Sequence, residues 1–289
     1  MRRFREVGIR PKTRHGQNFL IDLNLHRLLV NTADVQPNDI VLEIGTGTGG
    51  ITTAVAPLAA KVITVEIDEQ LFELASEELI DFTNVVMIKQ DALRNKNKLN
   101  PHVVDAVEQA LAEGPDRRFK LVANLPYNIA TPIISNLLSA PVVPCSMTVT
   151  IQKELAERIT APPYCKDYSA LSIWIQSQCD AEIVRIMPPS VFWPRPKVYS
   201  AILQISLNAE KKGRIPDLEY FHTFVRSLFF HRRKFLRSVL LSAYKGKLDK
   251  PAVDAVLEAV GSDPSTRAEQ LSIEQVMKLC WALRAAAGN

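Results

Sequence analysis

Short apolar runs alternate with longer stretches of helical periodicity through the first half of the chain. The runs have the length and β-branched content of buried strands. We expect strands at residues 40–44, 61–67, 85–89, 119–123 and 147–151. We expect helices near residues 48–59, 69–80, 101–112 and 129–139, after a first helix that Asp22 caps. This alternation predicts βαβ units and a parallel sheet with helices on both faces.

Two further strand-like runs, 181–187 and 198–207, flank a proline-rich segment. The connection between them is too short for a parallel crossover, so we expect one antiparallel pair to close the sheet.

The pattern changes at residue 208. A polar stretch, 209–216, is typical of a linker, and only helical periodicity follows it, at residues 218–230, 234–243, 252–260 and 273–285. The sequence thus predicts an α/β domain over residues 1–207, with a mostly parallel sheet, and a small all-α domain over residues 208–289.

Charge is distributed unevenly over these parts. Residues 1–15 hold six basic residues and one acidic residue, and residues 211–250 hold eleven basic and three acidic residues. The whole chain has a formal net charge of only +4, so the remainder carries −9. An acidic body with two basic segments is expected of a protein that docks on a polyanion.

Composition excludes several classes. A hydrophobic content of 47% excludes wholesale disorder. The four cysteines form no C-x-x-C pair, so we expect no metal site and no disulfide framework. The sequence has neither a run of about 18 apolar residues nor the apolar segment of a secretory signal. We therefore expect a cytoplasmic protein with no membrane partner, and a monomer by default.

A glycine-rich loop, Glu43-Ile44-Gly45-Thr46-Gly47-Thr48-Gly49-Gly50, follows the first main strand and opens a helix. Glycines let the backbone approach a ligand closely, and a helix N-terminus offers unpaired N–H groups. The loop fits the G-x-G-x-x-G pattern of dinucleotide-binding proteins and also the E-x-G-x-G-x-G pattern of methyltransferases. Glu66, which ends the next strand, suits ribose hydroxyls in either case. The loop alone leaves NAD, S-adenosylmethionine (SAM) and a turn without ligand open.

The ends of the next two strands favour SAM. Asp91 can accept a hydrogen bond from an adenine amine, although a helix N-cap is the simpler interpretation of Asp91 alone. Asn124-Leu125-Pro126-Tyr127 leaves the fourth strand, where open α/β sheets place ligands.

This tetrapeptide suits methyl transfer to an adenine amine. The amine is a poor nucleophile because its lone pair is delocalised into the ring. Two acceptors, the Asn124 side-chain oxygen and the Leu125 carbonyl, would help the nitrogen to pyramidalise. Pro126 fixes the backbone, and Tyr127 offers a ring on which an extruded base can stack.

Further motifs accompany these: Gly16-Gln17-Asn18-Phe19-Leu20, Val65-Glu66-Ile67-Asp68, Gln90-Asp91-Ala92, Gln152-Lys153-Glu154, Pro188-Pro189-Ser190-Val191-Phe192 and Pro194-Arg195-Pro196-Lys197-Val198-Tyr199-Ser200-Ala201. Over almost its whole length the chain resembles the ribosomal RNA adenine N6-dimethyltransferases, most closely the bacterial small-subunit (16S) branch. The resemblance implies a Rossmann-like SAM-dependent methyltransferase fold with a small helical C-terminal domain. It also implies dimethylation of the N6 amines of two adjacent adenosines near the 3′ end of 16S rRNA, in an immature small subunit.

The resemblance implies roles by position. The catalytic residues would be Asn124, Leu125, Pro126, Tyr127 and Phe192, with the rings of Tyr127 and Phe192 sandwiching the target adenine. The cofactor-binding residues would be Gln17, Asn18, Leu20, Glu43, Gly45, Gly47, Glu66, Ile67, Asp91, Ala92 and Asn124.

Three positions depart from the family pattern. His15 stands where an apolar residue is usual, Thr46 replaces a common proline, and Trp193 is unusually bulky. We expect His15 to be structural, because the methylated amine can lose its proton to solvent without a base.

The second basic segment, His231-Arg232-Arg233-Lys234-Phe235-Leu236-Arg237, lies between two expected helices. We expect it to contact RNA phosphates, with Phe229, Phe230 and Phe235 holding it to the body. The RNA-binding residues would be Arg232, Arg233, Lys234, Arg237 and Lys197. A similar Arg-Arg-Lys run marks the small-subunit branch and is missing from the antibiotic-resistance branch that methylates 23S rRNA. The N-terminal arm would order on RNA through Arg2, Arg3, Arg5, Arg10, Lys12 and Arg14.

Other functions remain as alternatives. A DNA adenine methyltransferase usually has proline where Leu125 stands and carries a target-recognition domain that is not visible here. A 23S rRNA methyltransferase, or a non-catalytic RNA-binding assembly or transcription factor, would share the fold. A dehydrogenase would not explain the Asn-Leu-Pro-Tyr motif or the basic segments.

Overall fold

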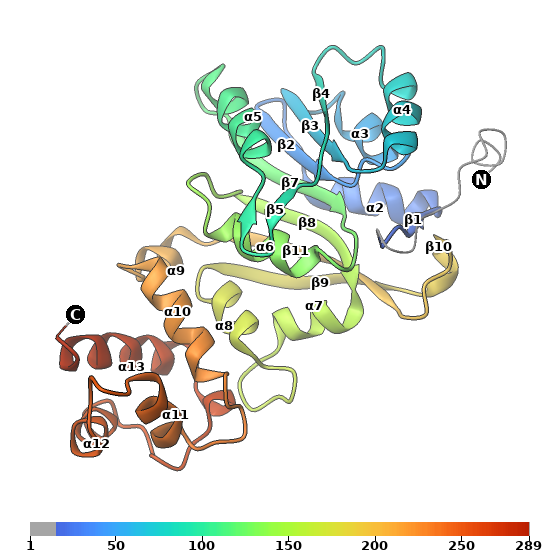
Figure 1. Ribbon diagram of the computed structural model, residues 1–289. Coiled ribbons are helices and arrows are strands. Elements are labelled where there is room, and N and C mark those ends of the chain that lie inside the picture. The colour runs from blue at the N-terminus through green and yellow to red at the C-terminus, as the bar shows by residue number, and fades with distance from the viewer. Residues whose placement is uncertain (1–15, 289) are drawn as a thin grey trace. The chain divides into compact units, whose positions relative to one another are not determined.

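The apolar runs form a seven-stranded sheet in the computed structural model, which describes residues 16–288 (Figure 1). The strands are β2 (Asp39–Ile44), β3 (Lys61–Glu66), β4 (Val85–Lys89), β7 (Arg118–Asn124), β8 (Ser146–Gln152), β9 (Cys179–Met187) and β11 (Ser200–Leu207). Their order is β4-β3-β2-β7-β8-β11-β9. The pairs from β4 to β8 are parallel, and β11 runs antiparallel to β8. The predicted mostly parallel sheet is confirmed.

Helices cover both faces of this sheet (Figure 1). They are α2 (Leu23–Ala33), α3 (Gly50–Val55), α4 (Glu69–Glu78), α5 (Pro101–Ala112) and α6 (Ala130–Leu138). Asp22 caps α2 as predicted, since its carboxylate accepts from the Asn24 N–H at 2.9 Å. On one face, Leu29 of α2 and Val55 of α3 pack in a core cluster with strand residues. Because both faces are covered, all six residues of β2 are buried.

Two short strand pairs lie outside the main sheet. β1 (Phe19–Leu20) pairs antiparallel with β10 (Phe192–Trp193), which follows the 3-10 turn Pro189–Val191. β5 (Leu93–Asn95) pairs with β6 (Lys98–Leu99). Segments this short carry no readable periodicity, so the sequence analysis did not predict them.

The described chain divides into two compact units. The first comprises residues 16–156 and 182–207, and the second comprises residues 157–181 and 208–288. The sequence pattern predicted one domain over all of residues 1–207, whereas the segment 157–181 groups with the C-terminal helices. Within the second unit, Trp174 of this segment stacks on His222 with ring centroids 4.2 Å apart, which explains why the segment groups with the C-terminal helices.

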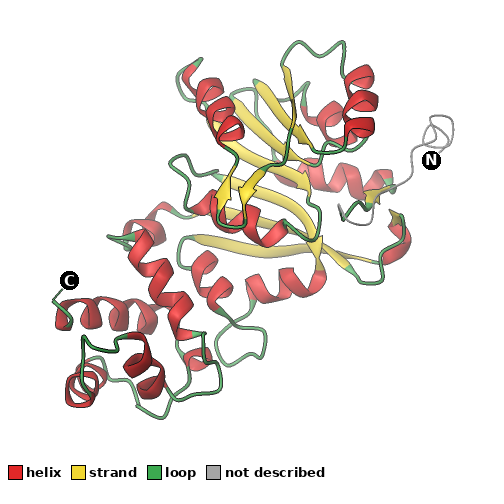
Figure 2. Cartoon of the chain, in the orientation of Figure 1, coloured by secondary structure: helices red, strands yellow, loops and turns green. Residues whose placement is uncertain are grey.

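The second unit is mainly helices and loops (Figure 2). Its helices include α8 (Ala170–Gln176), α9 (Ala209–Gly213), α10 (Leu218–Leu228), α11 (Leu236–Ala243), α12 (Lys250–Ala259) and α13 (Ile273–Ala286), and α7 (Lys153–Thr160) crosses the border between the units. The four predicted C-terminal helices correspond to α10–α13, whereas α9 occupies part of the expected linker. None of the helices in residues 16–288 is both long and apolar enough to cross a membrane.

Candidate functional site

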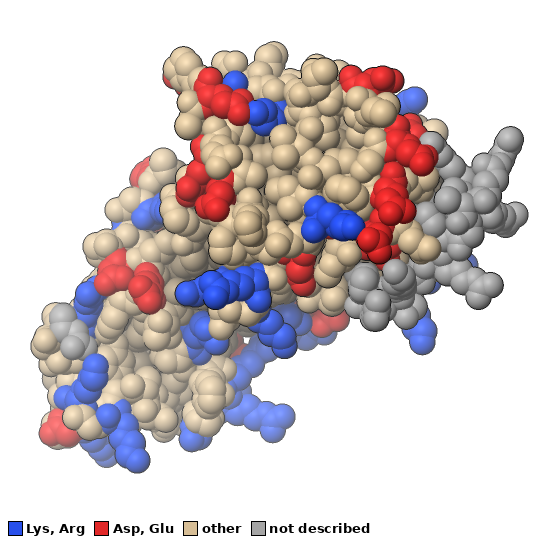
Figure 3. Space-filling model, turned by 45° about the horizontal axis from the view of Figure 1, so that its top comes forward, with Lys and Arg blue, Asp and Glu red and all other residues tan. Residues whose placement is uncertain are grey.

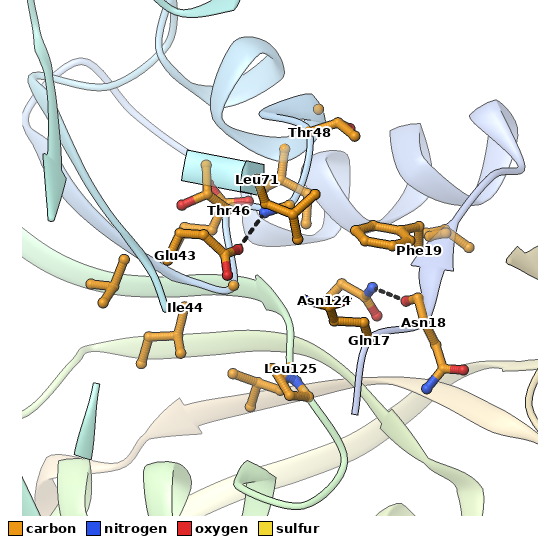
Figure 4. A pocket seen from close by; sticks show the side chains of 18 of the residues that line it. Gln17, Asn18, Phe19, Glu43, Ile44, Thr46, Thr48, Leu71, Asn124 and Leu125 are labelled. Atoms are coloured by element: carbon orange, nitrogen blue, oxygen red, sulfur yellow. Dashed lines mark hydrogen bonds between the residues drawn. The ribbon is translucent and has the colours of Figure 1, made fainter. Parts of the chain in front are cut away.

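A cavity of about 1130 Å³ lies in the first unit, at the carboxyl ends of β2, β3, β4 and β7 (Figure 4). Open α/β sheets bind their ligands at this edge. All eleven residues expected to hold the cofactor line this cavity: Gln17, Asn18, Leu20, Glu43, Gly45, Gly47, Glu66, Ile67, Asp91, Ala92 and Asn124. Leu125 and Pro126 of the expected catalytic set also line it.

The glycine loop is fixed between β3 and the N-terminal segment. The Gly45 N–H donates to the Val65 carbonyl at 2.8 Å, and the Gly47 N–H donates to Glu66 Oε2 at 2.9 Å. Gly47 has φ +58°, and a Cβ atom there would lie 3.1 Å from the Phe19 ring. A side chain at position 47 would therefore strain the backbone and push against Phe19.

A buried chain of hydroxyl groups supports Glu43 beneath the loop. The Thr64 hydroxyl donates to Glu43 Oε2 at 2.9 Å, and the Thr52 hydroxyl donates to the same oxygen. Thr46, the departure from the common proline, lies with its hydroxyl 2.6 Å from that of Thr64 and so extends this chain. Burial raises the pKa of Glu43 to about 8. Glu43 Oε1 has no hydrogen-bond partner among the described residues, which leaves one buried polar atom at the cavity wall.

Glu66 and Asp91 present carboxylates at two other points of the wall. Glu66 is 4% exposed, and its two oxygens accept from the N–H groups of Gly47 and Asp68, each at 2.9 Å. Burial raises its pKa above the usual range. A carboxylate has about four acceptor positions, so Glu66 retains capacity for ligand hydroxyls. Asp91 is exposed and accepts from the Leu93 N–H at 2.9 Å. The strand β5 follows it rather than a helix, so Asp91 is not a helix N-cap, and it lines the cavity.

Asn124 connects the end of β7 to the N-terminal segment. Its Nδ2 donates to the Asn18 carbonyl at 2.7 Å, the bond drawn as a dashed line in Figure 4. Because the amide nitrogen is engaged, Oδ1 is left as the acceptor of this side chain. Gly16 has φ +63° and lies so close to Asn128 that a Cβ atom would come within 2.7 Å of its Oδ1. The segment before α2 is therefore packed directly on the Asn-Leu-Pro-Tyr motif.

The two expected stacking rings are not brought to the cavity. Phe192 is 2% exposed and packs in the core cluster with Met187 and Ile202. The pairing of β10 with β1 places Phe192 in the core, and its role in covering one side of a base stays a prediction. Tyr127 is half-buried, and its hydroxyl lies 2.5 Å from Ser200 Oγ. Neither ring is among the described residues that line the cavity.

Some lining residues were not among the predicted site residues. Phe19 and Asn128 line the cavity, and both lie within or beside the quoted motifs. Trp193, another departure, stacks on Phe19 with ring centroids 6.3 Å apart, so its bulk supports the wall. His26 lines the cavity from α2, and burial lowers its pKa. Nothing in the sequence distinguished His26 from the other polar residues of this amphipathic helix, so it was not predicted to line the cavity.

The predicted RNA-binding residues differ in their surroundings. Lys197, in the first unit, is exposed. In the second unit, Arg237 Nε lies 2.5 Å from Asp254 Oδ1, and Arg232 Nε lies 2.7 Å from Glu269 Oε2. Arg233 and Lys234 are exposed and form no ion pair with any residue of the range 16–288. Figure 3 shows Lys and Arg side chains gathered over the second unit.

The expectation that Phe229, Phe230 and Phe235 hold this segment to the body is met by Phe229 alone. Phe229 contacts the buried Tyr168 ring edge-on, as an anchor would. Phe230 is 82% exposed and Phe235 is 52% exposed, so these two rings do not hold the segment to the body. His15 and the basic N-terminal arm lie outside the described residues. Within the described range, no group of three or more His, Cys, Asp or Glu side chains could hold a metal ion.

Comparison with known proteins assigns the chain to a family. A sequence model described as ribosomal RNA adenine dimethylase matches residues 8–283. The chain belongs to this family. Among relatives, the ribosomal RNA small subunit methyltransferase A of Halothermothrix orenii is 39% identical over 261 residues, which cover 90% of this chain and 84% of the relative.

Two solved structures share the fold of this chain. A dimethyladenosine transferase from Plasmodium falciparum superposes with a TM-score of 0.76 at 24% identity, over 93% of this chain and 98% of that one. The 23S rRNA methyltransferase ErmE superposes with a TM-score of 0.64 at 26% identity, over 92% and 99%. The predicted family and the predicted methyltransferase fold are therefore confirmed.

Proposed function

We propose that this chain transfers methyl groups from SAM to the N6 amines of two adjacent adenosines near the 3′ end of 16S rRNA, within an immature small ribosomal subunit. Family membership supports adenine dimethylation of ribosomal RNA, and the name of the Halothermothrix relative supports the small subunit. We also propose that the protein acts in the cytoplasm, as a monomer.

The residues of the cavity fit SAM. Glycines of the loop line the cavity without side chains, and Glu43 Oε1 is a buried polar atom with no partner among the described residues. Glu66 would accept from the ribose hydroxyls, and Asp91 from the adenine amine. When bound, SAM supplies an electrophilic methyl group on sulfur.

The observation that carries the proposal is the hydrogen bond from Asn124 Nδ2 to the Asn18 carbonyl at 2.7 Å. This bond engages the amide nitrogen of Asn124, so Oδ1 would be the atom that accepts a hydrogen bond from an N–H of the target amine. A second N–H would be accepted by the Leu125 carbonyl. Acceptance of both hydrogens withdraws the lone pair from conjugation with the ring and directs it at the methyl group. The new nitrogen–carbon bond would form as the sulfur–methyl bond broke and the neutral thioether S-adenosylhomocysteine left; the nitrogen would then release a proton to water, so no side chain would need to act as a base.

Tyr127 would support the target base. Stacking on an aromatic ring stabilises an extruded base, and the contact of the Tyr127 hydroxyl with Ser200 Oγ restricts rotation of that ring. Phe192 would contribute a second ring only after it leaves the core. The exposed cations Arg233, Lys234 and Lys197 would contact phosphates.

The test is methyl transfer from radiolabelled SAM to four acceptors: immature small subunits, naked 16S rRNA, 23S rRNA and duplex DNA. We expect immature small subunits to be labelled, with dimethyladenosine at two adjacent positions after digestion. Label on 23S rRNA alone, or on DNA alone, would overturn the proposed substrate. No label on any acceptor, with SAM bound, would favour a non-catalytic assembly factor.

A further inference from the structure

Exposed aromatic side chains of the second unit gather beside the basic segment. Three large hydrophobic side chains are left exposed among the described residues of this unit, and all three are aromatic: Tyr164, Phe230 and Phe235, at 75%, 82% and 52%. Exposed rings of this size are unfavourable in water and are typical of a surface that another molecule covers. Phe230 and Phe235 bracket the basic run, whereas Tyr164 comes from a distant part of the chain.

Arg232 joins these two parts of the chain. Its Nε donates to Glu269 Oε2 at 2.7 Å, and its Nη2 donates to the Lys166 carbonyl. The Glu269 carbonyl in turn accepts from the Tyr164 N–H at 2.9 Å. The loop that carries Tyr164 and Lys166 is thereby fixed beside the turn that carries Phe230. Arg232 is thus engaged within the protein, and its exposed neighbours Arg233 and Lys234 supply the positive charge that remains available to a partner.

The backbone of Tyr164 supports a functional role for its ring. Tyr164 has φ +66°, a left-handed conformation that a bulky residue rarely adopts. Strain of this kind persists where the surrounding contacts impose it, and it concentrates at functional sites. Here the strained residue is one whose ring is exposed rather than buried.

The exposed cations complete the surface. Lys166, Arg233 and Lys234 are exposed beside the rings. The acids Glu269 and Asp254 are paired with Arg232 and Arg237, so they are engaged by other cations of this unit. We define the aromatic–basic surface as Tyr164, Lys166, Phe230, Arg233, Lys234 and Phe235.

We infer that the aromatic–basic surface binds an unpaired stretch of ribosomal RNA, with bases stacked on its rings and phosphates beside its cations. Rings alternating with cations are the combination that recognises single-stranded nucleic acid, because every base offers a face for stacking and every nucleotide carries a phosphate. A paired helix hides its base faces and would engage only the cations. The inference rests on the proposed function for the class of partner, and it adds which structural element of the RNA the second unit recognises.

Binding of the full-length protein to two RNA probes tests this inference. One probe is a hairpin with a wide unpaired loop, and the other is a fully paired duplex of the same length. For each of Tyr164→Ala, Phe230→Ala and Phe235→Ala, we expect affinity for the hairpin to fall by about 5- to 150-fold, the equivalent of one lost base stack. Affinity for the duplex should stay unchanged. Tyr164→Phe keeps the ring and should bind the hairpin as the wild type does.

Two controls separate stacking from a structural role. Ile80→Ala removes a hydrophobic side chain that is 79% exposed in the first unit, and it should leave both affinities unchanged. Tyr164→Gly removes the ring and also relieves the left-handed strain, so it should weaken hairpin binding without lowering the melting temperature.

Three outcomes would overturn the inference. In the first, the alanine variants keep their hairpin affinity. In the second, they lose affinity for the hairpin and the duplex equally. In the third, they keep their RNA affinity but no longer bind small-subunit particles. The last would assign the surface to a protein partner. Methyl transfer by the wild type is measured in parallel, so failure of the proposed function would appear as missing label, whatever the hairpin affinities.

Discussion

Glu66 in the cavity is 4% exposed, and both of its oxygens accept backbone hydrogen bonds, whereas Arg233 and Lys234 extend into solvent without an ion pair among the described residues. The cavity holds Glu43 and Glu66 out of water, where each contact is strong and little affected by salt. The aromatic–basic surface holds its charges in water, where each contact is weak and screened. Substitutions in the cavity should therefore alter SAM binding or the rate of methyl transfer. Substitutions in the aromatic–basic surface should alter RNA affinity, which sums many contacts and depends on salt concentration.

Asn124→Ala should have the largest effect. It removes an acceptor that matters most as the amine pyramidalises, so the rate of methyl transfer should fall by about 100-fold or more. RNA affinity, measured by filter binding, should change little. Asn136→Ala, on α6 of the same unit, is the matched control and should keep its activity.

The hydrogen bond to Asn18 allows a competing outcome for Asn124→Ala. Asn124 could instead serve only to anchor the N-terminal segment. In that case the substitution would lower SAM affinity by the same factor as it lowers the rate of methyl transfer at saturating SAM. Calorimetric titration with SAM separates the two roles. An equal loss in both measurements would remove Asn124 from the chemistry.

Glu66→Ala should have the next largest effect. Loss of a carboxylate that accepts from ribose hydroxyls should weaken SAM binding by about 1.5–3 kcal/mol, or roughly 10- to 150-fold. Glu66→Gln keeps one acceptor oxygen and should recover part of this loss. Glu69→Ala, an exposed carboxylate on α4, is the control. Wild-type SAM affinity in a folded Glu66→Ala variant would exclude Glu66 from the site.

In the second unit, Arg233→Ser with Lys234→Ser should alter the salt dependence of RNA binding. Each neutralised phosphate contributes about 0.7–0.9 to the slope of log affinity against log salt, so the slope should flatten by about 1.4–1.8. Arg232→Ser should instead lower the melting temperature, because Arg232 binds Glu269 and the Lys166 carbonyl. The reverse pattern, with Arg232→Ser flattening the slope and the double variant leaving it unchanged, would contradict these assignments.

The sequence predicted the cavity better than the surface, for a physical reason. Glu66, Asp91 and Asn124 end parallel strands, and parallel strands bring their carboxyl ends to one edge whatever the details of packing. Strand periodicity and the glycine loop are local signals, so the lining of the cavity followed from them and from the family motifs.

Burial of individual rings depended on contacts between distant segments. Phe192 enters the core because the two-residue strand β10 pairs with β1 (Phe19–Leu20), and no local sequence pattern predicts so short a pair. Phe229 is anchored on Tyr168 while Phe230 faces solvent, although the two are neighbours in the sequence. The grouping of residues 157–181 with the C-terminal helices depends in the same way on the stacking of Trp174 on His222.

The smallest expected effect concerns Glu43 and the pH dependence of stability. Burial raises its pKa to about 8 in the folded protein, whereas the unfolded chain releases this proton near the usual value of 4.5. Between these values folding takes up a proton, so the contribution of Glu43 to the free energy of unfolding is fully present below the lower value and is lost as pH rises through the upper one. Glu43→Gln does not titrate. Relative to this variant, the wild type should lose about 1 kcal/mol of unfolding free energy between pH 6 and pH 7.

Urea unfolding of both proteins at a series of pH values, without added SAM, measures this difference. Glu69→Gln serves as the control for replacing an exposed glutamate, and its curve should run parallel to that of the wild type between pH 6 and pH 7. Parallel curves for the wild type and Glu43→Gln would mean that Glu43 is already charged in the folded protein at neutral pH. In that case Glu43 Oε1 would face the ligand as part of a carboxylate. A divergence with the expected sign would instead mean that the protein presents a neutral carboxyl group there, so that Glu66 and Asp91 alone would supply the negative charge of the cavity wall.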